Sequence, residues 1–494
     1  MTWRRPFAAT IALLAAALGA GCEPGPPSGR GHGVLVIAVD GLRADHVGAL
    51  GYDRNTTPNL DRLAAEGAIF EQTFTPAPGL IPGHAAVLTG CDPFVSQRRP
   101  QIELELGERW LIPELLPRLA VELLAGGYRT AAFADSADLS PVLGFEQGFQ
   151  EFQVFEPADY WQDDRAGVRA RTERFLTWLR QLERSESWFA YVHLNDLERV
   201  WSVPIEGRGD LFEPRPHMQW IPPVGHSEPV FFALPRSRWR GNNLTVGEYE
   251  VRYDGALQYV DAELGGLFER LRREGRFEDT TVAVVGTFGT QFGEAGLLLD
   301  HGMLSMADLH VPWILRPALG RGFELGPREQ LASTIDLAPT LLELAGVPLP
   351  AGMHGVSQVG VLRGDLEPAR EYAYASCGRL YGFAVIGERW VYELTHPATA
   401  SHPSLARSWF GTDSPPNELR EILYDRSEEP FPPLDLRMPK GAHFQEMGDA
   451  GKLWYGRYME LARRALHLDK LFFDPIEPEE AAELRALGLL GDDA

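Results

Sequence analysis

The chain has 494 residues, of which 44% are hydrophobic and 23% are charged, and its formal net charge is −23. A chain of this length and hydrophobicity can bury a large core, which excludes a disordered protein and favours one large domain with a smaller one beside it. The acidic balance excludes nucleic acid as a diffuse electrostatic partner, because phosphate binding uses clustered Lys and Arg. A sulfate or phosphate ester would need a local positive site against this background.

The N-terminal segment has the pattern of an export signal. Two arginines precede an apolar run from Phe7 to Leu18, and small residues then lead to Cys22. The run is too short for a membrane span, so we expect residues 1–21 to be a signal peptide. A cysteine after small residues resembles a bacterial lipoprotein signal, which implies lipidation of Cys22, a flexible tether over residues 22–32 and a membrane anchor in the cell envelope. An ordinary cleaved signal is the alternative.

Short β-branched runs alternate with helical patterns after this segment, which is typical of a parallel sheet covered by helices on both faces. The predicted strands are Val34–Val39, Arg129–Ala134, Trp188–His193 and Thr281–Val285. The predicted helices are one that begins after the cap Asn55–Pro58, then Ile112–Leu124, Tyr253–Leu271 and Asp336–Ala345. Because Thr281–Val285 is almost wholly apolar, we expect it at the centre of the sheet.

The segment from Thr75 to Gly90 resembles the nucleophile segment of the sulfatases and of the wider alkaline-phosphatase-like superfamily. Sulfatases read Cys-x-Pro-Ser-Arg here, followed by a run ending in Leu-Thr-Gly, and many bacterial relatives read Thr-x-Pro-Ser-His. The residues that match are Pro82, His84 and Thr89-Gly90. Gly83 replaces the Ser, and Leu80 replaces the reactive residue. Because leucine has no lone pair with which to attack sulfur or phosphorus, we assign no catalytic nucleophile.

Further landmarks of the family follow in order along the chain: Gly127–Ala132, Tyr253-Asp254, Tyr259–Asp261, Val311-Pro312, Asp336–Leu342, Leu423–Asp425 and Glu483–Gly491. The resemblance implies an α/β fold in which helices sandwich a large, mostly parallel sheet. It divides the chain into a sulfatase-like domain over residues 33–370 and a smaller C-terminal α+β subdomain over residues 371–494. The strand-like runs Tyr372–Ser376 and Phe383–Tyr392 fit that subdomain. The stretch Pro204–Asn243 has no regular period and is predicted to be an insertion.

Two cysteines follow Cys22, so at most one internal disulfide, between Cys91 and Cys377, can form, and the sequence leaves open whether they pair. Cys91 begins a segment that looks like the start of a formylglycine motif. It lacks the Arg at the fifth position and follows the Leu-Thr-Gly run instead of preceding it. We therefore interpret Cys91 as a buried structural thiol.

Asp40 directly follows the first predicted strand, at the sheet edge where ligands gather in open α/β folds. The resemblance implies a metal ligand here, for one divalent cation such as Ca²⁺, whereas a cap for the following turn is the structural alternative. The partner segment of relatives reads Ser-Asp-His-Gly, and this chain has Thr287 and Phe288 in place of the Asp and His. A third imidazole is replaced by Ala295. We therefore expect no cofactor, with a single cation at Asp40 as the alternative.

The third predicted strand ends where relatives read His-x-x-Asp-Pro-His, and this chain keeps His193 and Asp196 but has Glu198 in place of the last His. Glu198 remains a candidate metal ligand or base, although an exposed loop glutamate is the simpler reading. The segment Asp300-His301-Gly302 matches a His-Gly near the substrate pocket of the family. Candidate metal ligands are therefore Asp40, Asp196, Glu198 and Asp300, and a candidate anion-accepting pocket consists of Arg43, His84, His193 and His301.

Three hypotheses follow from these residues. The first is a non-catalytic sulfatase-family lipoprotein that binds a glycan, a sulfated or phosphorylated ligand, or a protein. The second is an active sulfuric or phosphoric ester hydrolase in which a rebuilt metal site activates water without a protein nucleophile. The third is a purely structural envelope component whose cleft is filled by side chains such as Leu80 and Phe288. We favour the first.

Overall fold

The computed structural model describes residues 31–93, 112–155, 167–200, 212–213, 245–292, 299–318, 322–365, 367, 369–377, 382–395, 420–426 and 445–453. Cys22, residues 23–30 of the tether, Ala295 and most of Pro204–Asn243 lie outside these residues. Among the helices that the structure describes, none combines the length and the apolar character that a membrane span requires.

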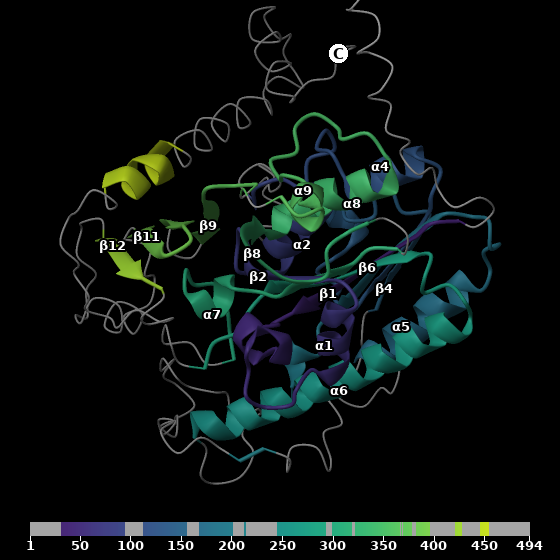
Figure 1. Cartoon of the computed structure of the whole chain (residues 1–494), viewed down its shortest axis with the longest axis horizontal. Coiled ribbons are helices and arrows are strands. Elements are labelled where there is room, and N and C mark those ends of the chain that lie inside the picture. Colours follow the sequence, from purple (N-terminus) through teal and green to yellow (C-terminus); the bar gives the residue numbers. More distant parts are fainter. Residues whose placement is uncertain are drawn as a thin grey trace, which may run out of the picture.

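An eight-stranded sheet forms the centre of the molecule, in the order β4-β3-β5-β1-β6-β7-β2-β8 (Figure 1). Its strands are β1 Gly33–Asp40, β2 Ala68–Phe74, β3 Arg129–Ala134, β4 Glu151–Val154, β5 Trp188–Leu194, β6 Thr280–Phe288, β7 Trp313–Arg316 and β8 Gly326–Ser333. Neighbours pair in parallel except around β7, which runs antiparallel to β6 and β2. The predicted mostly parallel α/β sheet is therefore confirmed, with Thr281–Val285 inside the fully buried central strand β6.

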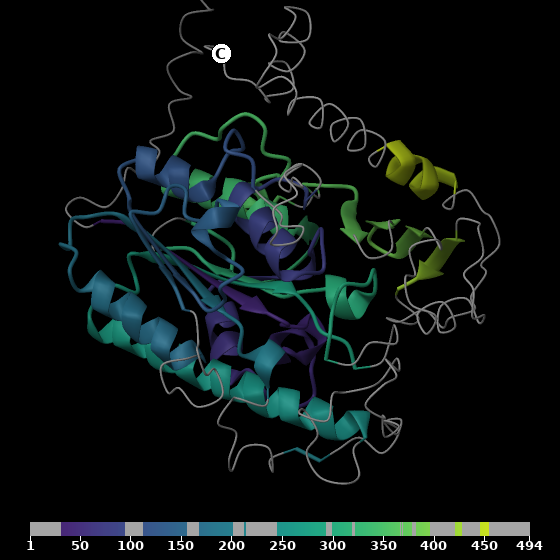
Figure 2. The same cartoon turned by 180° about the vertical axis from the view of Figure 1, so that it is seen from behind.

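Helices cover both faces of this sheet, as Figures 1 and 2 show from opposite sides. The helices are α1 Pro58–Ala65, α2 Leu80–Thr89, α4 Leu119–Ala125, α5 Gly167–Leu179, α6 Val246–Arg273, α7 Met306–Leu309, α8 Leu337–Ala345 and α9 Val359–Leu362. Side chains of β1 alternate between the two cores. Leu35, Ile37 and Val39 pack with α1, α5 and α6, whereas the alternate residues pack with α2, α4 and α8.

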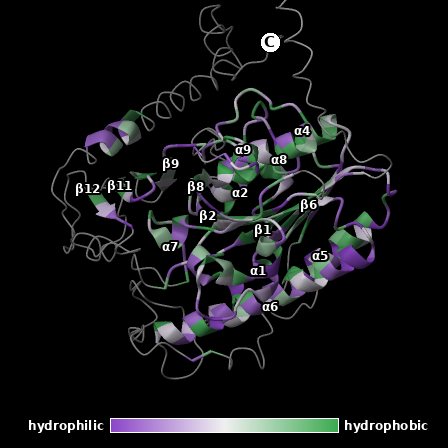
Figure 3. Ribbon diagram, in the orientation of Figure 1, coloured by the Kyte–Doolittle hydropathy of each residue, from purple (hydrophilic) through white to green (hydrophobic). Residues whose placement is uncertain are grey.

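Hydropathy follows this layering. In Figure 3 the strand β6 is coloured hydrophobic, while α5 and α6 carry hydrophilic residues along their length. The helix α6 begins with a capping box, in which the Thr245 side chain accepts from the backbone N–H of Glu248 and the Glu248 side chain accepts from the N–H of Thr245. Three arginines occupy its last turn, where they complement the negative end of the helix dipole.

One helix prediction was wrong over its first half. The pattern over Ile112–Leu124 predicts a helix from Ile112, but α4 begins only at Leu119. Pro113 and Pro117 explain the difference, because proline donates no N–H and clashes with the preceding turn of a helix. The guanidinium of Arg118 donates instead to the free carbonyls of this segment, among them those of Ile112 and Pro113.

A second, antiparallel sheet contains β9 Ala373–Cys377, β10 Gly382–Ile386, β11 Trp390–Thr395 and β12 Arg420–Asp425, in the order β12-β11-β10-β9. The run Phe383–Tyr392, which reads as one strand in the sequence, is split between β10 and β11. This small sheet shares a hydrophobic core with the large one, because Ala375 and Ile386 pack in the same cluster as Phe74 and Leu331.

Candidate functional site

The candidate site lies at the carboxyl ends of the central strands. Asp40 is the last residue of β1, which pairs in parallel with β5 on one side and β6 on the other, so the ends of these three strands meet there. β5 contributes His193, β6 contributes Thr287, and His84 reaches the same point from α2. All four side chains are completely buried.

Both carboxylate oxygens of Asp40 accept hydrogen bonds. Oδ1 accepts from the Thr287 hydroxyl and from His84 Nε2 at 2.9 Å, and Oδ2 accepts from His193 Nε2 at 2.7 Å. The two imidazole rings lie edge to face, with their centroids 4.4 Å apart. Burial raises the pKa of Asp40, but the neighbouring His193 and His84 outweigh burial and hold this pKa well below its ordinary range. Asp40 is therefore a buried anion held by three donors.

The tautomer of His193 follows from its second contact. The backbone N–H of Asp135 donates to His193 Nδ1 at 3.1 Å. A ring nitrogen that accepts an N–H carries no proton, so the single ring proton lies on Nε2, where it is donated to Asp40. His193 is thereby a neutral donor whose orientation is fixed by the backbone that follows β3.

His84 is the middle of a chain of hydrogen bonds. Its Nδ1 lies 2.6 Å from the Tyr191 hydroxyl, and its Nε2 faces Asp40. Burial lowers the pKa of His84, which favours a neutral ring, and burial raises the pKa of Tyr191. The arrangement consistent with both is a Tyr191 O–H that donates to His84 and a His84 Nε2–H that donates to Asp40.

Arg43, a member of the candidate anion pocket, is buried and engaged by the protein. Its Nε and Nη2 donate to the carboxylate of Asp45 at 2.9 and 2.7 Å, and its Nη1 donates to the Thr290 carbonyl at 3.1 Å. The guanidinium also lies over the ring of Phe292, 5.0 Å from its centroid. These contacts fix the loop after β1 against the loop after β6.

Asp196 lies close to β3 and α5. Its Oδ1 accepts from the backbone N–H of Val168 at 3.2 Å, at the start of α5. Arg171 of the same helix forms a buried ion pair with Asp135 at 3.2 Å. Burial, together with the charge of Asp135, raises the pKa of Asp196 to about 7. In the described part of the chain, no ion pair or hydrogen bond joins Asp196 to Asp40.

Glu198 and His301 lie together, and unlike the Asp40 cluster they retain some solvent exposure. Glu198 Oε2 lies 3.3 Å from His301 Nδ1, and the His301 ring packs on Phe288 with centroids 4.2 Å apart. Burial lowers the pKa of His301, but Glu198, with smaller contributions from Asp308 and Asp300, outweighs burial and raises it to about 9. Asp300 accepts the backbone N–H of His301.

The family model of the sulfatases matches residues 32–347 of this chain, which is well over half of its length. The chain belongs to the sulfatase family. It is 23% identical to a sulfatase of Formosa agariphila over 70% of this chain and 75% of that protein, and 28% identical to arylsulfatase A of Bos taurus over 68% of each. Among solved structures, a phosphonate monoester hydrolase of Agrobacterium radiobacter shares the fold with a TM-score of 0.61 at 19% identity, over 88% of this chain and 96% of that one.

The sulfatase family implies a divalent cation, and the residues at Asp40 do not fit one. A hard cation such as Ca²⁺ takes about six to eight oxygen ligands, whereas the groups around Asp40 are two imidazoles and one hydroxyl. Two imidazoles with a carboxylate suit a transition metal better, but a ligating histidine normally donates its second N–H to an acceptor. His193 Nδ1 instead accepts from Asp135, so its Nε2 lone pair is not available to a metal.

The nucleophile position of the sulfatase family is the first residue of α2. Leu80 is half-buried there and packs against the hydrophobic core under that helix. Gly83, which replaces the family Ser, allows α2 to lie directly on the end of β6, because a Cβ at Gly83 would come within 2.8 Å of the Thr287 carbonyl oxygen. The substitutions at positions 83 and 287 are therefore in direct contact.

Three groups around Asp40 were missed by the sequence reasoning: the hydroxyl of Thr287, which contacts Asp40 itself, and Tyr191 and the backbone N–H of Asp135, which contact its two histidines. Tyr191 precedes His193 by two residues in one strand, so the period of two places both side chains on the same face and could have identified it. The contact of Asp135 could not have been identified from the sequence, because it is made by the backbone N–H and not by the side chain. Thr287 reads as a lost ligand in the sequence and not as a new donor.

A second buried polar cluster joins the segment after β1 to α6. Asp254 accepts from His46 Nδ1 at 2.8 Å, from the Tyr52 hydroxyl at 2.8 Å and from Arg54 Nη1 at 2.6 Å. Ligand atoms of His46, Glu250 and Asp254 lie within 4.8 Å of one another. The Arg54 guanidinium beside Asp254 already supplies the positive charge, so the cluster is a clamp between elements and not a cation site.

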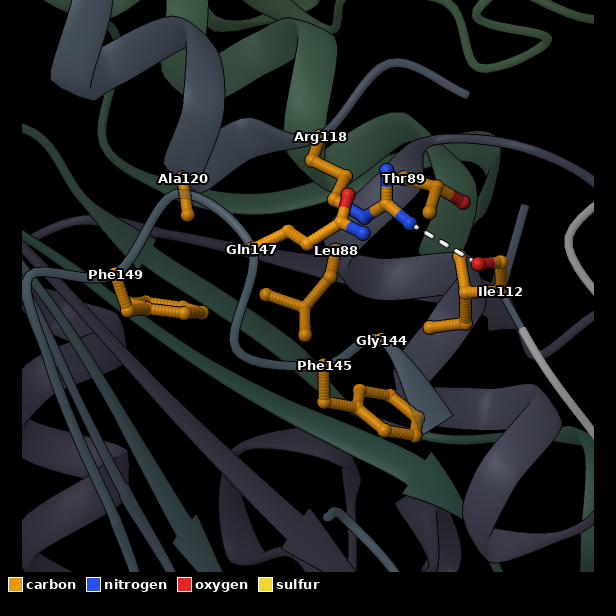
Figure 4. A pocket seen from close by; sticks show the side chains of 9 residues that line it. All are labelled: Leu88, Thr89, Ile112, Arg118, Ala120, Gly144, Phe145, Gln147 and Phe149. Carbon is orange, nitrogen blue, oxygen red and sulfur yellow. Dashed lines mark hydrogen bonds between the residues drawn. The ribbon is translucent and has the colours of Figure 1, made fainter. Parts of the chain in front are cut away.

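A pocket lies at the C-terminal end of α2, the end opposite Leu80 (Figure 4). Its lining is mostly apolar and includes Leu88, Ile112, Phe145 and Phe149. It has room for about one water molecule, which excludes a sugar or an ester as its occupant. Nearby, Cys91 is a buried free thiol, as the sequence predicts, and burial raises its pKa to about 12.

Proposed function

We propose that this chain is a non-catalytic member of the sulfatase family, an exported envelope lipoprotein that binds a glycan or protein partner at the carboxyl edge of its sheet. The observation that carries the proposal is the saturated carboxylate of Asp40. Each of its oxygens accepts from a protein donor, and every donor is buried. Internal hydrogen bonds thus occupy the carboxylate that a metal ion would need.

The nucleophile position gives independent support. Leu80 offers no group that could form a covalent intermediate, and the residue one turn later, His84, donates to Asp40 and is not free to act as a base. Covalent ester hydrolysis in this fold would need a nucleophile near a metal, and neither requirement is supported by these side chains. A binding role needs only the fold and an accessible edge.

Metal analysis and an ester panel test the proposal on the mature chain. We expect no stoichiometric divalent metal after purification, no turnover of aryl sulfate, phosphate diester or phosphonate ester substrates, and an unfolding free energy that chelation by EDTA leaves unchanged. A family enzyme that is active on aryl sulfate serves as the positive control. The proposal fails if the protein retains one metal per chain that is lost in the Asp40→Ala variant. It also fails if the wild type hydrolyses one of these esters and Asp40→Ala abolishes that turnover.

An active hydrolase with a rebuilt metal site is the second candidate. The observation in its favour is that ligand atoms of Asp40, His84 and His193 lie within 4.8 Å of one another. This reading requires the His193 ring to move its proton from Nε2 to Nδ1, where the Asp135 N–H now points. It therefore predicts that added Zn²⁺ or Mn²⁺ binds one per chain and restores ester turnover, whereas the non-catalytic proposal predicts neither.

A further inference from the structure

The pair of Glu198 and His301 lies at the carboxyl edge and is more exposed than the Asp40 cluster. Glu198 lies in the 3-10 turn Leu197–Arg199 that follows β5, and His301 follows β6. Their side chains are 17% and 23% exposed, whereas those of His84 and His193 are fully buried. A ligand at this edge can therefore reach the pair but not the two histidines on Asp40.

Several contacts hold His301 in place. Its ring packs on Phe288, and its backbone N–H donates to Asp300 Oδ1 at 2.9 Å. Leu299, two residues earlier, has a φ of 49°, and its N–H donates to the Gln291 carbonyl at 2.7 Å. A non-glycine residue in this conformation is strained, so the contacts around Leu299 hold the loop in place.

The pair presents one donor-capable and one acceptor atom without partners. Glu198 Oε1 is buried and has no hydrogen-bond partner in the structure. It lies at the end of β1, since a Cβ at Gly41 would come within 2.9 Å of it. Within the residues that the structure describes, His301 Nδ1, 3.3 Å from Glu198 Oε2, is also buried and makes no hydrogen bond, which leaves Nε2 as the ring nitrogen for a ligand. Because Oε1 is buried, the oxygen of Glu198 that a ligand can meet is Oε2, beside His301.

The charges around the pair oppose an anion, because three carboxylates surround the single positive charge that His301 carries when it is protonated. Glu198 lies directly beside His301, and Asp300 and Asp308 are close enough to act on the same ring. Arg43, the other cation of the candidate pocket, is engaged by Asp45. A sulfate or phosphate group at His301 would therefore face the carboxylate of Glu198 at short range, in a site from which most water is absent.

We infer that the Glu198–His301 pair contacts the ligand of this protein and selects an uncharged, hydroxyl-bearing group, such as the neighbouring hydroxyls of a sugar, over a sulfate or phosphate ester. One hydroxyl donates to Glu198 Oε2, the carboxylate oxygen that faces His301, and the next pairs with His301 Nε2. A hydroxyl both donates and accepts, so it suits Nε2 whether or not that nitrogen carries a proton. The inference rests on the proposed non-catalytic binding function and narrows its ligand class.

Charge selectivity tests the inference. The full mature chain, with labelled histidines, is titrated at pH 7 with inorganic sulfate, N-acetylglucosamine and N-acetylglucosamine 6-sulfate, and the His301 NMR resonances are followed. We expect the neutral sugar to bind at least tenfold more tightly than its sulfate ester, and inorganic sulfate to leave His301 unshifted. Glu198→Gln, which keeps the shape and removes the charge, should gain at least tenfold in affinity for sulfate.

Glu186→Gln is the matched control, because Glu186 also forms an ion pair, with Arg129, but precedes β5 at the opposite edge of the sheet. It should bind all three probes like the wild type, and circular dichroism checks the folding of both variants. The inference is overturned if wild type binds sulfate as tightly as Glu198→Gln does, if the sulfate ester binds better than the neutral sugar, or if no probe shifts His301. Turnover of the ester would instead overturn the proposed function.

Discussion

At the scale of single residues, Asp40 stabilises the fold because it accepts hydrogen bonds from three elements. Replacing it by Asn removes the charge and points an N–H₂ group at an imidazole or hydroxyl donor. We expect Asp40→Asn to lower the free energy of unfolding by about 3 kcal/mol, the size typical of a broken buried ion or hydrogen-bond pair. Urea denaturation measures the loss. Asp53→Asn, at an exposed position, should change the value by less than about 0.5 kcal/mol.

The raised pKa of Asp196 predicts that the stability of the fold depends on pH. Its folded pKa of about 7 lies above the value of about 3.9 for an unfolded aspartate, so the folded state binds more protons between these values and stability falls as the pH rises from about 4 to 7. Asp196→Asn keeps the acceptor for Val168 and removes the titration. We expect it to flatten this fall and to raise the unfolding free energy at pH 8 by about 1–3 kcal/mol.

Urea denaturation of the wild type and of Asp196→Asn at pH 4, 6 and 8 measures this effect. Asp138→Asn is the control, because Asp138 is exposed and follows the neighbouring strand β3. An Asp196→Asn curve that runs parallel to the wild-type curve across this range would contradict the expectation.

At the scale of elements, the contact between α2 and β6 depends on Gly83. A Cβ there would lie 2.8 Å from the Thr287 carbonyl oxygen, a contact that backbone movement alone can relieve. Alanine gains about 0.5–1 kcal/mol in helix propensity, but overpacking costs about 1–3 kcal/mol, so the clash prevails. We expect Gly83→Ala to lower the melting temperature, and Gly266→Ala to raise it, because the exposed Gly266 on α6 has open space around it. Equal melting temperatures for both variants would exclude a tight α2–β6 contact.

The sequence predicts elements well where one local signal dominates. The central strands are continuous apolar runs, and their predicted limits fall within two residues of β1, β3 and β5. Ile112–Leu124 has helical spacing as well as two prolines, and the prolines decide the outcome. The position of Asp40 follows from its place after a strand. Its role could not be predicted, because its donors come from α2, β5 and β6, and the tautomer of His193 depends on the backbone N–H of Asp135.

At the scale of the whole molecule, the fold separates the tether from the candidate site. Gly33 begins β1 at the amino edge of the sheet, and Asp40 ends it at the carboxyl edge. Eight residues of strand span about 25 Å. A chain anchored at Cys22, eleven residues before β1, would therefore have the amino edge of its sheet nearer to the anchor than the Glu198–His301 pair is. This orientation suits the capture of a soluble or surface glycan better than the capture of a lipid headgroup.

Lipidation at Cys22 is the step on which this orientation depends, and a thiol substitution tests it. Without the sulfur no thioether to a lipid can form, and among the described helices none is long and apolar enough to cross a membrane. We expect Cys22→Ser to move at least tenfold more protein from the membrane fraction to the soluble fraction of a bacterial host, and to abolish incorporation of labelled palmitate. Cys91→Ala removes the buried thiol instead and should stay with the membrane. If Cys22→Ser remains in the membrane fraction, another segment anchors the chain, and the amino edge need not lie nearer to the anchor.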